Sequence, residues 1–383
     1  MQAPLKNSDS VLKAVQICVD RKINFAAYRL PHKKDFTLVV QTDADIKEVE
    51  RIAEDFPTEG FLIAPFSRQS GSKTYLIRPD IVLNSAANEA ALIESPSELE
   101  SILHSIPVLN YATDKRHTPD TIKADYLVQI NEAIRRIKAG EFEKVVLSRI
   151  KSVGGIFIPK LSLIFDTLCS LYDNAFVYLF CIKGEYWIGA TFEPFVCSRG
   201  NELNTVSLAG TRAFMDANME LNNWNKKELL EQDYVTRHIE KILFDYSVTG
   251  YTQQGPYAAR AGNLSHLRTD FIFSIQAAGE RLPSLIQALH PTPAVCGMGS
   301  GKAMDFIRNT EKHNRDYYTG FLGPVGLDDL MQLYVNLRCM KVYDDRLVLF
   351  TGGGITLDSV PEDEWEETEI KSDTLLAVIS QIS

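Results

Sequence analysis

The sequence predicts an α+β protein with a large, mainly antiparallel sheet layered with helices. Its strand-like segments come in adjacent pairs separated by helices, not in strict β-α-β alternation, and this order favours antiparallel pairing. A hydrophobic fraction of 45% and a charged fraction of 23% are typical of globular proteins. A chain of 383 residues is also long enough to bury a sizeable core.

The first part of the chain is expected to contain strands, one helix and an irregular stretch. Apolar runs predict strands at FAAYRLP, FTLVVQT and FLIAPF. The apolar spacing of ADIKEVERIAEDF, residues 44–56, predicts an amphipathic helix. Residues 84–118 are polar and irregular, which indicates an insertion or a linking region.

Helices and paired strands are expected in the remainder. Helical periodicity predicts helices over residues 125–142, at SLIFDTLCSLY, and over residues 221–247. KVVLSRIKSV predicts a strand, and AFVYLFCI with EYWIGA predicts a hairpin around Lys183-Gly184. HLRTDFIFSIQA follows as a strand, and SLIQALH and KAMDFIRNTEKH as helices. A hairpin ending in the glycines of TGGGI precedes a final helix.

Charge, cysteines and hydropathy limit the possible partners and compartment. The net charge of −10 argues against nucleic-acid binding, which needs clustered Lys and Arg. The six cysteines form no C-x-x-C pair, which indicates a reducing compartment and no structural zinc. We find no signal-peptide pattern and no run of about 18 apolar residues, the length of a membrane span. We expect a cytoplasmic protein without membrane contact.

Three familiar site motifs are excluded. GMGSGKA, residues 297–303, lacks the first glycine of a phosphate-binding loop, and Ala303 replaces the Ser or Thr that would contact magnesium. The seven histidines do not form an H-E-x-x-H pattern, so a zinc hydrolase is unsupported. A G-x-S-x-G nucleophile turn is also missing from the sequence.

Two helical turns each carry a pair of glutamates. Glu364 and Glu367 are three residues apart with Lys371 four further on, and Glu228 and Glu231 repeat the spacing. Residues at these spacings share one face of a helix. Such pairs are commonly solvated surface, but two of them together also have the oxygen ligands that a hard divalent cation prefers. The pattern alone leaves both readings open.

Nine short motifs in one order give a more specific indication. They are KVVLSR (144–149), GATFEP (189–194), SLAGTR (207–212), HLRT (266–269), HPTPAVCG (290–297), RDYYTGFLGPVG (315–326), LRCMK (337–341), TGGGI (351–355) and EWEETEIK (364–371). This succession resembles the chorismate-utilising enzymes: isochorismate synthases, salicylate synthases, and the large subunits of anthranilate and aminodeoxychorismate synthases. The resemblance covers about residues 120–383.

The resemblance implies a single large α+β domain with its site between two layers, chorismate as substrate, and a bound Mg²⁺ near the substrate's carboxylate. We assign residues 1–118 to an N-terminal part of the same fold and residues 119–383 to the chorismate-binding catalytic region. The resemblance further implies metal ligands at Glu231 and Glu367, with Glu228 and Glu364 ligating directly or through water. Its implied substrate contacts are Gly210, Thr211, His266, Ala294, Tyr318, Arg338, Gly352 and Lys371.

The resemblance also implies an acid and a base. Lys144 matches the base that deprotonates the water attacking C2, and Glu193 matches the acid that protonates the departing C4 hydroxyl. Strand periodicity places Lys144, Val146 and Ser148 on one face, although a surface lysine at a strand end is the ordinary alternative. Burial is expected to lower the pKa of the lysine, and the apolar run FEPF is expected to raise the pKa of Glu193.

These matches favour an isochorismate synthase. Lys144 stands where the anthranilate branch carries Gln, so ammonia transfer and a glutaminase subunit are not expected. Ala294 favours isochorismate formation over salicylate synthesis, which would add pyruvate elimination. The expected pathway is menaquinone synthesis, with siderophore synthesis as the alternative, and the expected assembly is a monomer or weak oligomer. Four positions depart from the family pattern: Gln232 replaces His, Ser207 replaces Pro, Glu193 follows Phe192 where Ser-Pro is common, and Gly353 replaces Ala.

Overall fold

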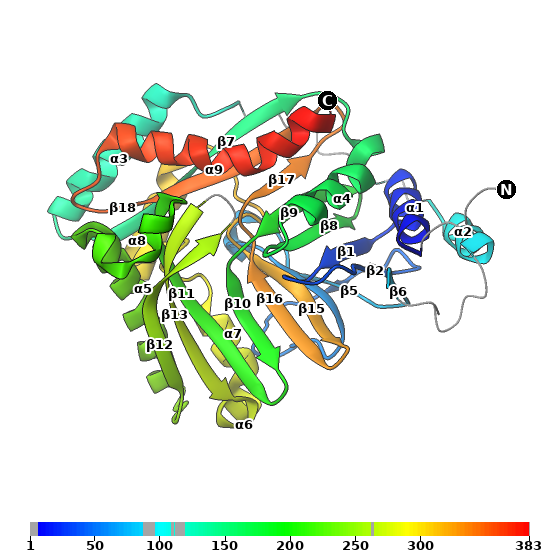
Figure 1. Ribbon diagram of the computed structural model, residues 1–383, viewed down its shortest axis with the longest axis horizontal. Coiled ribbons are helices and arrows are strands. Elements are labelled where there is room, and N and C mark those ends of the chain that lie inside the picture. The colour runs from blue at the N-terminus through cyan, green and yellow to red at the C-terminus, as the bar shows by residue number, and fades with distance from the viewer. Residues whose placement is uncertain (1–6, 87–95, 109–110, 112–118, 262–263, 383) are drawn as a thin grey trace.

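The computed structural model describes residues 7–86, 96–108, 111, 119–261 and 264–382 (Figure 1). Two nine-stranded sheets form its centre, and neighbouring strands in both are antiparallel throughout. The first sheet contains, in spatial order, β14 (Gly297–Met298), β7 (Lys144–Gly154), β18 (Arg346–Ile355), β17 (Cys339–Val342), β9 (Glu185–Thr191), β8 (Phe176–Ile182), β1 (Phe25–Arg29), β2 (Thr37–Val40) and β6 (Ile81–Asn84).

The second sheet is built in the same way. It contains, in spatial order, β12 (Thr252–Ala261), β13 (Leu264–Ser274), β11 (Glu202–Ala213), β10 (Pro194–Arg199), β16 (Leu330–Val335), β15 (Phe321–Leu327), β4 (Gly60–Ala64), β5 (Tyr75–Ile77) and β3 (Lys47–Glu48). The helices are α1 (Asn7–Asp20), α2 (Pro96–Ser105), α3 (Lys123–Lys138), α4 (Leu161–Leu171), α5 (Lys226–Asp245), α6 (Ile275–Ala278), α7 (Leu282–Leu289), α8 (Ser300–Thr310) and α9 (Pro361–Ile382).

The two sheets face each other across a shared aromatic core, and helices cover their outer faces. Phe176 of the first sheet and Tyr334 of the second stack with ring centroids 4.3 Å apart. Helices α1, α4 and α9 pack on the outer face of the first sheet, where α9 runs beside α3 (Figure 1). Helices α5 and α7 cover the second sheet. Alternating side chains on a strand point to opposite faces of the sheet. Each sheet therefore contributes side chains to two hydrophobic cores.

The α+β class and the antiparallel pairing are confirmed, but the expected single sheet is two sheets. The predicted helix over residues 44–56 is wrong. Residues Lys47–Glu48 instead pair with β5 at the edge of the second sheet, and Ile46, Val49 and Ile52 are still buried. Pairing with an existing sheet therefore overrides the local helical spacing. Within the described residues, no helix is long and apolar enough to cross a membrane.

The stretch over residues 84–118 is not irregular throughout. It contains α2, whose Leu99 and Leu103 are buried beside α1. Residues 87–95, 109–110 and 112–118 of this stretch lie outside the described residues.

In the first part of the chain, β1, β2 and β6 extend the first sheet, while β3, β4 and β5 extend the second.

Replacing Phe176 by Ala tests the contact between the sheets. The Phe176 ring is fully buried and stacks on Tyr334, so its loss leaves a cavity. We expect Phe176→Ala to lower the free energy of unfolding by about 3–5 kcal/mol, measured by urea denaturation. Phe244, whose side chain is 83% exposed, is the matched control. Phe244→Ala should change the free energy of unfolding by less than about 0.5 kcal/mol. Equal losses would contradict this packing.

Candidate active site

A polar cavity lies where β7 and β18 of the first sheet approach β11 and β13 of the second. The cavity and its open mouth enclose about 850 Å³ of empty space, within the size range of small-molecule sites. Twelve of the fourteen sequence-predicted residues line it: Lys144, Glu193, Gly210, Thr211, Glu231, His266, Ala294, Tyr318, Arg338, Gly352, Glu367 and Lys371. Glu228 and Glu364 do not belong to this lining.

Lys144 begins β7 and is 2% exposed, so it is not the surface lysine of the ordinary alternative. Val146 lines the cavity with it, whereas Val145 and Leu147 pack on the other side against α3 and α8. The neighbouring strand β18 leaves room for the amine because it carries glycine at 354. A Cβ at Gly354 would lie 2.8 Å from the Lys144 Cε, closer than van der Waals contact allows.

Glu193 and Arg338 lie in two segments that cross from one sheet to the other. Glu193 follows β9 of the first sheet and precedes β10 of the second, whereas Arg338 connects β16 back to β17. The crossings are joined because Val335 N–H donates to the Glu193 carbonyl (3.0 Å) and Ala190 N–H donates to the Arg338 carbonyl (3.1 Å). These backbone bonds hold the two crossings together, and both side chains line the cavity.

Burial changes the protonation of Glu193. The residue is 6% exposed, and desolvation raises its pKa from 4.5 to about 8 although Lys144, Lys371 and Arg338 oppose the shift. A low-dielectric environment disfavours the charged carboxylate, and here it outweighs three cations. Glu193 is therefore mostly protonated at neutral pH, as the apolar FEPF run predicted.

The glutamates of α5 and α9 approach one another but are held by lysines. Lys371 Nζ lies 2.5 Å from Glu367 Oε1 and donates to the Gly352 carbonyl at 3.0 Å. Lys227 Nζ bonds Glu364 Oε1 at 2.6 Å, while Glu364 Oε2 is buried without a hydrogen-bond partner. As they stand, no three His, Cys, Asp or Glu side chains in the described part of the chain are grouped to hold a metal.

Burial and mutual repulsion act on the acidic groups themselves. The pKa of Glu231 is raised by desolvation, and the Glu367 carboxylate raises it further although Lys144 opposes the shift. The pKa of Glu364 is raised by burial and then by Glu367. Carboxylates in this state favour a cation nearby. Glu231, Glu364 and Glu367 therefore form one electrostatic group, which the two lysines neutralise in part.

Glu228 has a different environment from the other predicted ligands. Its carboxylate accepts two hydrogen bonds from Arg212, at 2.7 and 2.8 Å. It also accepts the backbone N–H of Asn225, whose side chain in turn caps the start of α5. Both oxygens are thus bonded to residues that fix the N-terminus of the helix carrying Glu231.

His266 lines the same cavity and is neutral at pH 7. Its Nδ1 lies 2.9 Å from the Gly210 carbonyl, which only accepts, so Nδ1 carries the proton and Nε2 is an acceptor. The pKa of His266 is lowered to about 3, mainly by desolvation and in addition by the Arg338 and Lys371 charges. Gly210 has a φ of 68° at a β-bulge in β11, between Ala209 and Thr211, where glycine is favoured.

Trp365, the second residue of the EWEETEIK segment of α9, orients the helix that carries Glu367. The guanidinium of Arg149 lies 3.9 Å from the centroid of the Trp365 ring. Arg149 also bonds Thr368 Oγ1 at 2.6 Å and forms an ion pair with Glu369. Two of the quoted motifs, KVVLSR and EWEETEIK, are therefore bound to each other, which places α9 over β7 and β18.

Two features of this site were not predicted from the sequence. Apolar residues near the predicted ones in the sequence, among them Phe192, Leu337 and Phe350, complete the cavity wall. Two of the four departures from the family pattern contact each other, because Gln232 donates to the Ser207 carbonyl at 3.0 Å. Strand alternation around Val146 and Phe350 could have indicated that these residues line the cavity. A single sequence carries no signal for the contact between Gln232 and Ser207.

The chain is similar to proteins that are named isochorismate synthases. The vibriobactin-specific isochorismate synthase of Vibrio cholerae is 32% identical over 243 residues, covering 61% of each chain. Isochorismate synthase MenF of Bacillus subtilis is 29% identical over 267 residues, or 67% of this chain. The alignments thus span 61% and 56% of the length of these curated relatives.

The fold of this chain is also similar to that of a solved structure. The menaquinone-specific isochorismate synthase MenF from Escherichia coli has a TM-score of 0.74 at 21% identity, covering 95% of this chain and 91% of that chain. A family model described as chorismate binding enzyme matches residues 5–380. Since this match extends over nearly the whole sequence, the chain belongs to the chorismate-binding enzyme family.

Proposed function

We propose that this protein is an isochorismate synthase. The observation that carries the proposal is a buried amine, Lys144, in the same cavity as a buried carboxyl, Glu193, that is protonated at neutral pH. The isochorismate synthase names of the relatives support the choice of reaction. Exchange of a hydroxyl group for water requires a base and an acid. Here an amine can accept the proton and a carboxyl can donate one.

In the proposed reaction Lys144 removes a proton from a water molecule, whose oxygen bonds to C2 of chorismate. The ring double bonds shift, and the C4 hydroxyl leaves as water after Glu193 protonates it. Lys144 gains one proton and Glu193 loses one, and both are restored from solvent between turnovers. We propose that Arg338 and Lys371 receive the two substrate carboxylates, a role that their cationic side chains and their position in the cavity lining support.

We propose magnesium as the cofactor, held by Glu231, Glu364 and Glu367. The buried, unpartnered Glu364 Oε2 and the all-oxygen donor set fit a hard divalent cation. Binding requires Lys227 and Lys371 to release the carboxylates that they now neutralise. When bound, the metal supplies positive charge for a substrate carboxylate. Glu228 takes an indirect part, since its oxygens bond Arg212.

The product is proposed to supply menaquinone synthesis, with siderophore synthesis as the alternative. A vibriobactin-specific and a menaquinone-specific isochorismate synthase are both among the similar proteins. Salicylate synthesis is the alternative reaction, and it differs by releasing pyruvate. Ala294, which lines the cavity, is the residue on which we base the choice of isochorismate as the final product.

Product analysis tests the proposed reaction. Chorismate incubated with the protein and Mg²⁺ should give isochorismate without pyruvate, measured by liquid chromatography and a lactate dehydrogenase-coupled assay. Chelation with excess EDTA should abolish turnover, and added Mg²⁺ should restore it. Stoichiometric pyruvate with salicylate fluorescence would establish the alternative reaction, and full activity in the chelator would rule out the metal.

Replacing the base tests the role of Lys144. Lys144→Gln keeps a polar side chain but removes the proton acceptor, so kcat should fall by about 10²–10⁴-fold, the usual contribution of a general base. The measurement is steady-state isochorismate formation. Lys151→Gln on the same strand is the matched control, since Lys151 bonds Glu369 away from the cavity. Unchanged turnover in Lys144→Gln would refute this assignment.

The raised pKa of Glu193 predicts a pH dependence. The carboxyl must be protonated to act as an acid, and it is protonated below its pKa of about 8. The kcat/KM for chorismate should therefore fall above pH 8, by about tenfold per pH unit, since kcat/KM reports groups of the free enzyme. The pH–rate profile between pH 6 and 10 gives the answer. A decline that begins near pH 5 would show that Glu193 is an ordinary carboxylate.

A further inference from the structure

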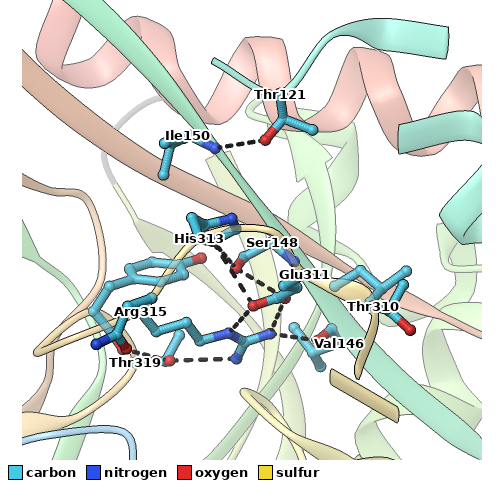
Figure 2. A network of polar contacts seen from close by, with 12 residues as sticks. Thr121, Val146, Ser148, Ile150, Thr310, Glu311, His313, Arg315 and Thr319 are labelled. Atoms are coloured by element: carbon cyan, nitrogen blue, oxygen red, sulfur yellow. Dashed lines mark hydrogen bonds and ion pairs between the residues drawn. The ribbon is translucent and has the colours of Figure 1, made fainter. Parts of the chain in front are cut away.

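The strand that carries Lys144 lacks a full partner strand on one side. Its outer neighbour β14 has only two residues, which pair with Lys144 and Val145. Beyond these two residues, the edge N–H and C=O groups of β7 have no neighbouring strand to pair with. They require other partners, because unpaired buried backbone groups are costly. Side chains from distant segments provide these partners over the next residues (Figure 2).

Glu311 and Arg315 bond the edge of β7 directly. Arg315 Nη2 donates to the Val146 carbonyl at 2.7 Å, and Ser148 N–H donates to Glu311 Oε1 at 2.7 Å. The Ser148 hydroxyl also donates to Glu311 Oε1, at 2.9 Å. These bonds replace the ladder that a neighbouring strand would make. Figure 2 shows the pair side by side along the strand.

The two side chains also bond each other. The Arg315 guanidinium meets the Glu311 carboxylate through two N–H donors, at 2.5 and 2.8 Å. Both side chains are 3% exposed, and the Arg315 charge lowers the pKa of Glu311 in spite of its burial. A bidentate pair of this kind has one preferred geometry, so it fixes position as well as balancing charge.

Arg315 further contacts two segments that line the cavity. Its Nη1 donates to the Val295 carbonyl at 2.9 Å and to Thr319 Oγ1 at 3.4 Å. Its own carbonyl accepts the N–H of Tyr318 at 2.8 Å. Val146, Val295, Tyr318 and Thr319 all line the cavity. One buried guanidinium therefore bonds three separate parts of the cavity wall.

We propose that Glu311 and Arg315 are positioning residues, which hold the β7 segment that begins with Lys144 and the Tyr318 segment in the geometry that the reaction requires. This inference rests on the proposed function for its rate effects, but not for its structural effect on β7. Neither side chain lines the cavity, so they act through the residues that they bond. A buried ion pair is weak evidence for stability, and conformational specificity is a better-supported reason to retain one.

The experiment uses a double variant, Glu311→Gln with Arg315→Met. It removes both charges together, because removing one alone leaves an unpaired buried charge that is strongly destabilising. Arg29→Met is the matched control. Arg29 is also a 2% exposed arginine that bonds backbone carbonyls, those of Lys33 and Ala175 among them, and it lies outside the cavity lining.

Two readouts separate positioning from general stability. In the double variant kcat for chorismate with Mg²⁺ should fall by about 10²-fold while KM stays within about threefold, as expected when reacting groups are misplaced. Hydrogen–deuterium exchange of the peptide spanning residues 144–150 should rise by about tenfold, with β8 unchanged. Arg29→Met should show neither change. It should raise exchange near β1 only.

The results distinguish this inference from the proposed function. A double variant with wild-type kcat and wild-type exchange over residues 144–150 would overturn the positioning role. An effect no larger than that of Arg29→Met would overturn it as well. A wild-type protein that leaves chorismate unchanged would refute the proposed function, and the exchange readout would then still test the contact between the ion pair and β7.

Discussion

The chemistry of this site depends on burying charged groups in the space between two sheets. Desolvation there raises the pKa of Glu193 to about 8 and lowers that of His266 to about 3. A carboxyl that is protonated at pH 7 can donate a proton, which its exposed, ionised form cannot. The imidazole stays neutral well below pH 7. Arg338 adds positive charge to the same cavity. Burial thus sets the protonation pattern on which the proposed proton transfers depend.

The fold delivers these groups by crossing between its sheets. Glu193 and Arg338 lie in adjacent crossings that are bonded through the backbone, whereas Lys144 and Gly354 lie on neighbouring strands of one sheet. The glycines of β18 let the Lys144 side chain and the α9 carboxylates approach the strand closely. The Arg149 contact with Trp365 then sets α9 against that strand pair. Each functional group is thus supported by regular structure.

Much of this arrangement could be predicted from the sequence, and the failures have physical reasons. The ordered motifs contain eleven of the predicted residues that line the cavity, and Glu231 of the second glutamate pair is the twelfth. Strand alternation placed Lys144 inward. The helix predicted over residues 44–56 fails because Lys47 and Glu48 complete a sheet edge formed by distant residues. The pairing of Lys227 with Glu364 and of Glu228 with Arg212 depends on long-range packing. No local pattern carries that information.

The central claim is that the cavity keeps Glu193 protonated at neutral pH. Infrared difference spectroscopy of the wild type against Glu193→Gln measures this directly, because a protonated carboxyl has its own C=O stretching band. The account predicts a band at pH 7 that the variant lacks and that disappears as the pH rises through about 8. A wild type without this band at pH 7, or with a band that titrates near pH 4.5, the ordinary pKa of glutamate, would contradict the account.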